Sequence, residues 1–152
     1  MRLVRILLIF SLVTPVLSGV SQECAGFHTQ TCPIPDFSYY YDQQSASFNL
    51  KVGDTAELQI VVFEKTDYYL SVCAHRRVNN VQIKVLEDSS DRTLLYDNIA
   101  EGFVDSVKFT NNSTRKIILE VMLPEQGNNR ANDGKERCVG VLIAKRIKVD
   151  EF

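Results

Sequence analysis

The chain has 152 residues, of which 24% are charged and 9% aromatic, with four cysteines, no tryptophan and a formal net charge of −2. That length allows about one domain, and an apolar fraction of 45% excludes a disordered, collagen-like or coiled-coil chain. The nearly neutral charge balance argues against a dedicated nucleic-acid binder, which usually carries a basic face.

Residues 1–21 have the pattern of a secretory signal peptide. A short basic segment is followed by an apolar stretch over residues 3–17 without an acid, and then by small residues suited to cleavage. A membrane anchor is the alternative, but the stretch is shorter than the roughly 20 residues that a span needs, and Pro15 interrupts it. We therefore expect export to the periplasm, the cell surface or the exterior, and no transmembrane segment in the mature chain.

Residues 22–36 are expected to form an extended N-terminal arm, and residues 37–152 a single domain. Four cysteines in an exported chain indicate two disulfides, for which three connectivities are possible. We favour Cys24–Cys32 as a local loop within the arm, with Cys73–Cys138 joining the ends of two strands. A Cys/His zinc site is the alternative, but no CxxC occurs and the two histidines lack paired spacing. No metal or cofactor is expected.

Alternation of apolar and polar residues with a period of two predicts about eight short strands. In the first half of the chain they cover residues 45–51, 58–63, 68–73 and 81–85. In the second half they cover residues 94–96, 104–109, 117–123 and 139–143. A polar loop rich in Asn and Gly separates the last two, over residues 125–136.

These strands follow one another at roughly 10–14-residue spacing, with no convincing amphipathic helix between them. The pattern predicts an all-β fold, an antiparallel β-sandwich of Ig-like or jelly-roll-like type stapled by disulfides. A closed β-barrel is the alternative, because strand spacing does not separate the two architectures.

The sequence contains no motif of a known catalytic site. It has no GxSxG elbow, no Walker-type glycine loop, no HExxH and no EF-hand loop. A Ser/His/Asp triad would have to use His28 or His75, and we expect both to be exposed loop histidines. A disulfide-bonded Cys73 could not act as a nucleophile, because the thiolate is the reactive form. The protein is therefore predicted not to be an enzyme.

Two groups of polar residues suggest surface sites of other kinds. Asp88, Asp91 and Asp97 bracket one hairpin and could offer oxygen ligands to Ca²⁺, although solvated turn residues explain them more simply. Asn111 and Asn112 begin two overlapping glycosylation sequons, which indicate an exposed loop.

Two runs of tyrosine are candidate binding residues, Tyr39-Tyr40-Tyr41 and Tyr68-Tyr69. Consecutive strand residues point to opposite faces, so each run should leave at least one ring outward. An exposed tyrosine can anchor a protein partner or stack on a sugar. Ordinary cross-strand packing of the rings is the alternative.

A small basic spot, His75-Arg76-Arg77, to which Lys84 could add, stands out on a chain with an acidic net charge. Arg76 and Arg77 could meet an anionic polysaccharide or a lipid headgroup. The simpler interpretation is a solvated hairpin tip.

The cysteine pattern and the strand sequences resemble a group of uncharacterised exported β-rich proteins of Bacteroidetes. The residues that carry this resemblance are the Cys24/Cys32 arm and the segments 45–48, 57–62, 67–73 and 138–143. The resemblance implies a Gram-negative envelope or secreted location, supports the Cys73–Cys138 pairing and makes the two sequons incidental. It implies no activity and no site residues. Residues 81–85 and 94–97 are more loosely similar to the paired strands of pre-peptidase C-terminal and GOLD-type sandwiches, which are non-catalytic accessory modules.

These observations favour a non-catalytic, envelope-associated binding protein whose partner is an envelope protein or a glycan. The tyrosines of both runs, with Arg76 and Arg77, form the candidate binding surface. One alternative is a structural component that self-assembles through an exposed edge strand. Another is a hydrolase with two carboxylates about 5–10 Å apart in a deep cleft.

Overall fold

The computed structural model describes residues 24–125 and 133–147. The expected signal peptide and most of the polar loop at residues 125–136 lie outside the described residues. Within the described residues, no helix is long and apolar enough to cross a membrane.

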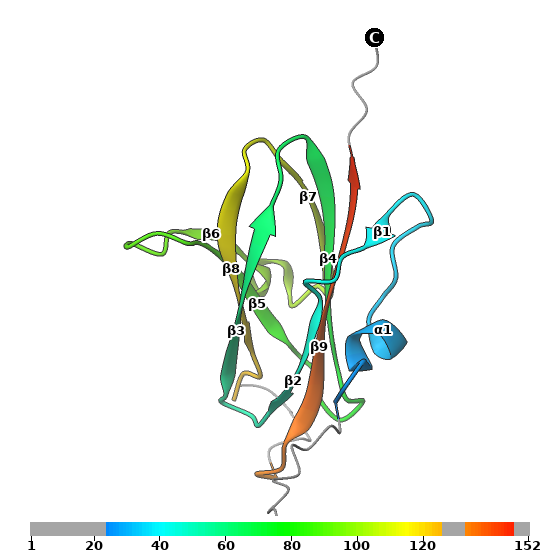
Figure 1. Cartoon of the computed structure of the whole chain (residues 1–152). Helices are drawn as coiled ribbons and strands as arrows, with labels where there is room; N and C mark the ends of the chain where they lie inside the picture. The colour runs from blue at the N-terminus through cyan, green and yellow to red at the C-terminus, as the bar shows by residue number, and fades with distance from the viewer. Residues whose placement is uncertain (1–23, 126–132, 148–152) are drawn as a thin grey trace, which may run out of the picture.

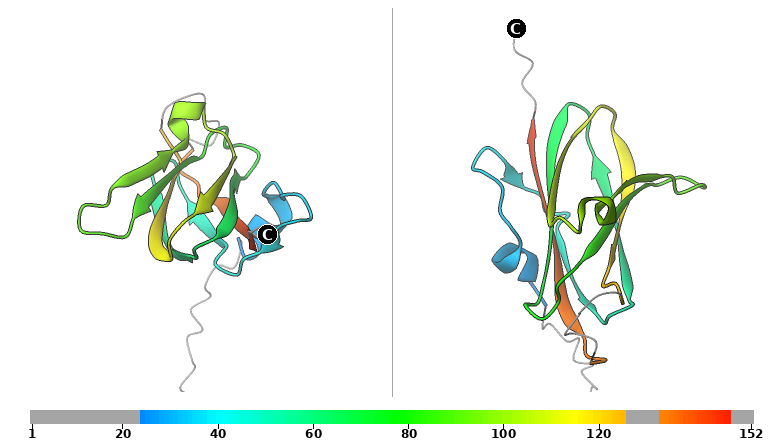
Figure 2. Two further views of the ribbon diagram at one scale, coloured as in Figure 1. Left: turned by 90° about the horizontal axis from the view of Figure 1, so that it is seen from above. Right: turned by 180° about the vertical axis from the view of Figure 1, so that it is seen from behind.

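The described chain folds into two antiparallel sheets packed face to face (Figures 1 and 2). The first sheet contains β1 (Tyr40–Tyr41), β2 (Ala46–Leu50), β9 (Arg137–Ile147), β4 (Thr66–Ala74) and β7 (Ser106–Asn111). The second contains β3 (Thr55–Val62), β8 (Arg115–Met122), β5 (Gln82–Glu87) and β6 (Leu94–Asp97). Two short helices accompany them, α1 (Phe27–Thr31) and the 3₁₀ helix η1 (Asn98–Glu101).

This arrangement confirms the predicted β-sandwich, and each of the eight predicted strands is present. Strand β1 was missed because two residues are too few to show alternation. It pairs with the end of β9, Tyr40 opposite Lys145 and Tyr41 opposite Ala144, while β2 pairs with the beginning of the same strand.

The main core lies between the sheets because alternate residues of each strand face the opposite sheet. Ile60 on β3 and the predicted inward face of β8 meet Leu70 on β4 and Ile143 on β9. The β8 face is completely buried, as its alternation predicts: Ile117, Leu119 and Val121, with Leu123 just beyond the strand.

A second, smaller core covers the outer face of the first sheet. Here Cys32, Tyr69, Leu142 and Ala144 are buried, with Tyr39 packed against them. The N-terminal segment forms this cover: α1 lies on the outer side of the first sheet, and β1 extends the edge of that sheet beside β9. The β5–β6 hairpin projects from the far side of the molecule (Figures 1 and 2). The arm was predicted to be extended, but it contains a helix and is packed on the sheet.

The two disulfides join Cys24 to Cys138 and Cys32 to Cys73. The four cysteines are bridged as predicted, but the favoured pairing is wrong. Cys73 lies opposite Gly140, which makes Cys138 its diagonal neighbour. Diagonal neighbours are about 7–8 Å apart, farther than the roughly 4.4–6.8 Å between the Cα atoms of a disulfide. Cys24 and Cys32 flank α1, so each instead reaches a different strand beneath the helix.

Gly140 is the point at which α1 approaches the sheet most closely. A Cβ at this position would lie 2.7 Å from the His28 Cα and 2.8 and 2.9 Å from the Sγ atoms of Cys73 and Cys32. The absence of a side chain is therefore what lets the helix and the Cys32–Cys73 disulfide lie directly on β9.

Candidate functional site

The candidate residues do not form one surface. Tyr40 and Tyr41 pair with the C-terminal end of β9, whereas Arg76 and Arg77 follow β4 and lie beside Cys138, near the N-terminal end of β9. The two tyrosines therefore lie beside one end of β9, and the two arginines lie beside its other end.

Tyr68 and Tyr69 are not surface residues, with exposed fractions of 0% and 6%. Tyr68 points into the sandwich, where its hydroxyl accepts a hydrogen bond from the Phe63 N–H at 2.9 Å; burial raises its pKa. Tyr69 points to the outer face and is covered by the Tyr39 ring, 6.1 Å between centroids. The expectation of an outward ring in this pair is wrong, because the arm covers the second face of β4.

The most exposed aromatic ring belongs to a turn that sequence analysis did not single out. Residues 36–39 form this turn, here called the arm turn, in which the Tyr39 N–H donates to the Asp36 carbonyl at 3.2 Å. The Asp36 carboxylate accepts hydrogen bonds from the Ser38 N–H, at 3.0 Å, and from the Ser38 hydroxyl. Phe37 lies at the tip with an exposed fraction of 99%.

Side chains from the sheet hold the arm turn in place. The Arg146 guanidinium lies over the Tyr39 ring, 4.8 Å from its centroid, and donates to the Ser38 hydroxyl at 3.1 Å. The Lys108 ammonium is 3.8 Å from the Asp36 carboxylate and 5.6 Å from the same ring. The hydrogen bonds from Ser38, reinforced by Lys108, hold the pKa of Asp36 below its ordinary value. The turn is thus fixed at its base and open at its tip.

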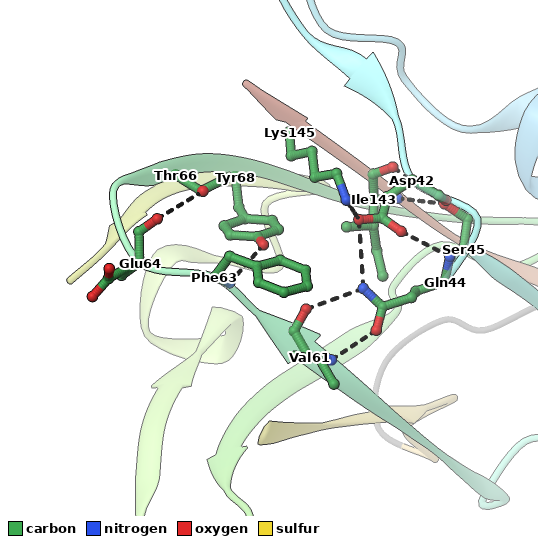
Figure 3. A network of polar contacts seen from close by, with 10 residues as sticks. All are labelled: Asp42, Gln44, Ser45, Val61, Phe63, Glu64, Thr66, Tyr68, Ile143 and Lys145. Carbon is green, nitrogen blue, oxygen red and sulfur yellow. Dashed lines mark hydrogen bonds and ion pairs between the residues drawn. The ribbon is translucent and has the colours of Figure 1, made fainter. Parts of the chain in front are cut away.

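The residues that follow β1 are anchored by polar contacts at the edge of the sandwich (Figure 3). Asp42 is buried and forms an ion pair with Lys145 at 2.8 Å. Burial opposes ionisation of Asp42, but hydrogen bonds from Lys145 and from the Gln44 N–H hold its pKa below the ordinary value. The Gln44 amide also bridges to the second sheet, accepting from the Val61 N–H at 2.7 Å and donating to the Val61 carbonyl at 3.1 Å.

His28 is buried, so its predicted place in an exposed loop is wrong. Its Nδ1 lies 2.7 Å from the Ser47 hydroxyl and its Nε2 lies 3.0 Å from the Tyr41 hydroxyl. Burial lowers its pKa. Because a serine and a tyrosine occupy its two nitrogens, no carboxylate orients it as in a catalytic triad. His28 holds the exposed Tyr41 against the helix.

The basic spot is larger than the sequence indicated. His75, Arg76 and Arg77 line a hollow of about 470 Å³ together with Lys135 and Arg137. Lys135 and Arg137 were missed because they lie more than 50 positions after Arg77 in the chain, just before Cys138. The pairing of β4 with β9 brings the two segments together, and the His75 N–H donates to the Cys138 carbonyl at 3.0 Å.

The acidic hairpin residues have local structural roles. Asp97 accepts from the Ile99 N–H and caps η1, and Asp88 accepts from the Gln59 side chain at 2.6 Å. No group of three or more His, Cys, Asp or Glu within residues 24–125 and 133–147 could hold a metal ion. Three hollows of the described chain have volumes of about 460–490 Å³. None favours the hydrolase hypothesis, since one is lined by the single carboxylate of Glu136, one by that of Glu101, and the third by none.

The two sequons differ in accessibility. Asn111 is buried, and its amide donates to the carbonyls of Phe63, at 2.9 Å, and Ser113. It is therefore not available for glycosylation, and the expectation of an exposed loop holds only for Asn112.

Comparisons with known proteins identify no family. No protein-family model matches the chain, and no curated protein is significantly similar to it in sequence. The solved structure of Aeromonas hydrophila PliG, a periplasmic inhibitor of g-type lysozyme, is 13% identical, with a TM-score of 0.47 over 75% of this chain and 92% of that one. Salmonella Typhimurium PliG is 15% identical, with a TM-score of 0.39 over 75% and 93%. Both TM-scores are below 0.5, so neither similarity carries an argument about family or function.

Proposed function

We propose that this protein is an exported, non-catalytic binding protein that engages a protein partner through the arm turn, with Phe37 as the anchor. The observation that carries the proposal is the complete exposure of this ring on a turn fixed by hydrogen bonds at its base. An aromatic side chain exposed to water lacks the favourable free energy that burial of its apolar surface would provide. On a rigid turn it can enter a partner's pocket with little further loss of conformational entropy.

The surroundings of Phe37 favour a protein over a glycan as the partner. Ile34, Tyr40 and Ile147 are also exposed, at 75%, 73% and 79%. Ile34 and Tyr40 flank the arm turn in the chain, and Tyr40 and Ile147 line one hollow with Ser38. Apolar side chains on a projecting turn suit an apolar depression in another protein.

A photo-crosslinking experiment tests this proposal. Benzoylphenylalanine is incorporated in place of Phe37 in the mature protein, which is irradiated in an extract of its native envelope and medium. The matched control carries the same group in place of Leu94, which is 53% exposed on β6 at the other side of the molecule. We expect one protein to be captured from position 37 and not from position 94.

The captured partner is then purified and its affinity measured for wild type and for Phe37→Ala. A central aromatic anchor contributes at least about 2 kcal/mol, so the variant should bind roughly 30-fold more weakly. Equal capture from both positions, or an unchanged affinity, would contradict the proposal. Capture of a second copy of this chain would favour the self-assembly alternative.

A further inference from the structure

Three of the four Lys and Arg side chains that line the hollow beside Cys138 form no ion pair with an acid among the described residues, unlike most cations on the sheets. Elsewhere the following pairs lie within 2.7–3.8 Å: Lys84–Glu120, Arg92–Glu57, Lys108–Asp36, Arg115–Glu87, Lys145–Asp42 and Arg146–Asp67. Within the described part of the chain, Arg76, Arg77 and Lys135 form no ion pair. The acid that lines the hollow is Glu136.

Arg137 forms the inner wall of the hollow. Its side chain is 10% exposed and its Nη2 lies 2.6 Å from the Asp133 carboxylate. Its Nη1 donates to the Glu136 carbonyl at 2.9 Å, while its buried Nε has no hydrogen-bond partner among the described residues. Asp133 thus pairs with the innermost cation. The remaining charged residues of the lining are Arg76, Arg77, Lys135 and Glu136, so the described lining keeps a net positive charge.

The backbone beneath these cations is fixed. The Val78 N–H donates to the His75 carbonyl at 2.8 Å, which closes a turn around Arg76 and Arg77. On the other side, the Cys24–Cys138 disulfide holds the start of β9. Three like charges on a rigid frame repel one another, and an anion placed between them would relieve that repulsion.

We propose that this hollow binds a ligand bearing a phosphate or sulfate group, held by Arg76, Arg77 and Lys135. Two guanidinium groups offer the paired N–H donors that match the oxygens of such a group, and the lysine adds a third charge. A volume of about 470 Å³ falls in the range of small-molecule sites. The site lies at the opposite end of β9 from the arm turn and does not depend on the proposed protein partner.

The proposal is tested by amide chemical-shift titration of the mature protein with two probes. Inorganic pyrophosphate represents phosphate ligands, and a sulfated disaccharide represents sulfated glycans. We expect shifts at residues 75–78 and 135–138 with at least one probe, saturating below 10 mM and weakening as NaCl is raised from about 0.05 to 0.5 M. The tighter-binding probe indicates the source of the group.

Two variants complete the test. Arg76→Ala combined with Arg77→Ala should weaken binding at least tenfold, and because both side chains are exposed, the fold should be retained. Arg115→Ala, which removes a paired arginine from β8, should leave binding unchanged. Absence of saturation with both probes, shifts spread over the whole surface, or equal effects of the two variants would overturn the proposal.

Discussion

Replacement of Gly140 by alanine tests whether α1 lies on the sheet as described. The added methyl group would meet three atoms at 2.7–2.9 Å, closer than side chains tolerate. One is a backbone atom of α1 and two belong to a disulfide, so none can move independently. Overpacking of this kind destabilises by about 1–3 kcal/mol. Lower entropy of the unfolded chain offsets about 0.4–1 kcal/mol of this loss. The net loss is therefore at most about 2.6 kcal/mol, with a central value of about 1.3 kcal/mol.

The assay is urea unfolding of the oxidised mature protein, followed by circular dichroism. The decisive comparison repeats the substitution in a Cys32→Ala, Cys73→Ala background. Removal of the two sulfur atoms opens space for the new methyl group, so the penalty of Gly140→Ala should fall by at least about 1 kcal/mol. If the penalty is the same in both backgrounds, the contact of residue 140 with the Cys32–Cys73 disulfide is refuted; if alanine stabilises the wild-type protein, the close approach of α1 to β9 is refuted as well.

Three further predictions concern single side chains. Burial depresses the folded-state pKa of His28 below its ordinary value of 6.5. The contribution of His28 to stability is therefore complete above pH 6.5 and is lost as the pH falls below it. His28→Gln should flatten the dependence of stability on pH between about pH 7 and 5, as measured by urea midpoints. Lys145→Met leaves the buried Asp42 without its ion-pair partner and should lower the free energy of unfolding by about 1–3 kcal/mol, with less loss when Asp42→Asn is added. In a glycosylating host, peptide mass spectrometry should find any glycan at Asn112 and none at Asn111, and occupancy of Asn111 would contradict its buried amide.

The strands were predictable because most of them have one buried and one solvated face. In β8, Ile117 and Leu119 alternate with half-exposed or exposed residues, and the period of two gives the register directly. The β-sandwich follows from several such strands with turns between them. This alternation can be recognised within each strand without knowing which distant segment packs on either face.

The errors at the cysteines, Tyr69 and His28 have one common cause, which is the position of the N-terminal segment. Sequence patterns could not indicate that the arm and the residues that follow it, up to Tyr41, fold back over β4 and β9. That single long-range contact buries Tyr69 and His28 and directs Cys24 and Cys32 away from each other. Cysteine spacing alone does not determine connectivity, because a short loop between two cysteines can be bridged by a helix lying on other strands.

The candidate sites were predicted only in part. Arg76 and Arg77 were recognised as an adjacent pair, whereas Lys135 and Arg137 join them only through strand pairing. Cys73 and Cys138 were expected to lie on neighbouring strands. On that basis, Lys135 and Arg137, which precede Cys138, could have been placed beside Arg76 and Arg77, which follow Cys73. Phe37 gave no signal at all, because a phenylalanine beside a turn has the same sequence context whether it is buried or exposed.

The connectivity of the Cys24–Cys138 disulfide has a consequence for proteolysis. It joins residues 114 positions apart, so nearly the whole folded chain forms one covalent ring. A protease that cuts the backbone once anywhere between these cysteines opens the ring without releasing a fragment. The nicked protein should keep its full mass on a non-reducing gel and separate into two pieces only after reduction. A first cut within the closed ring therefore removes no residues, and the contacts of the folded domain can hold the two pieces in place.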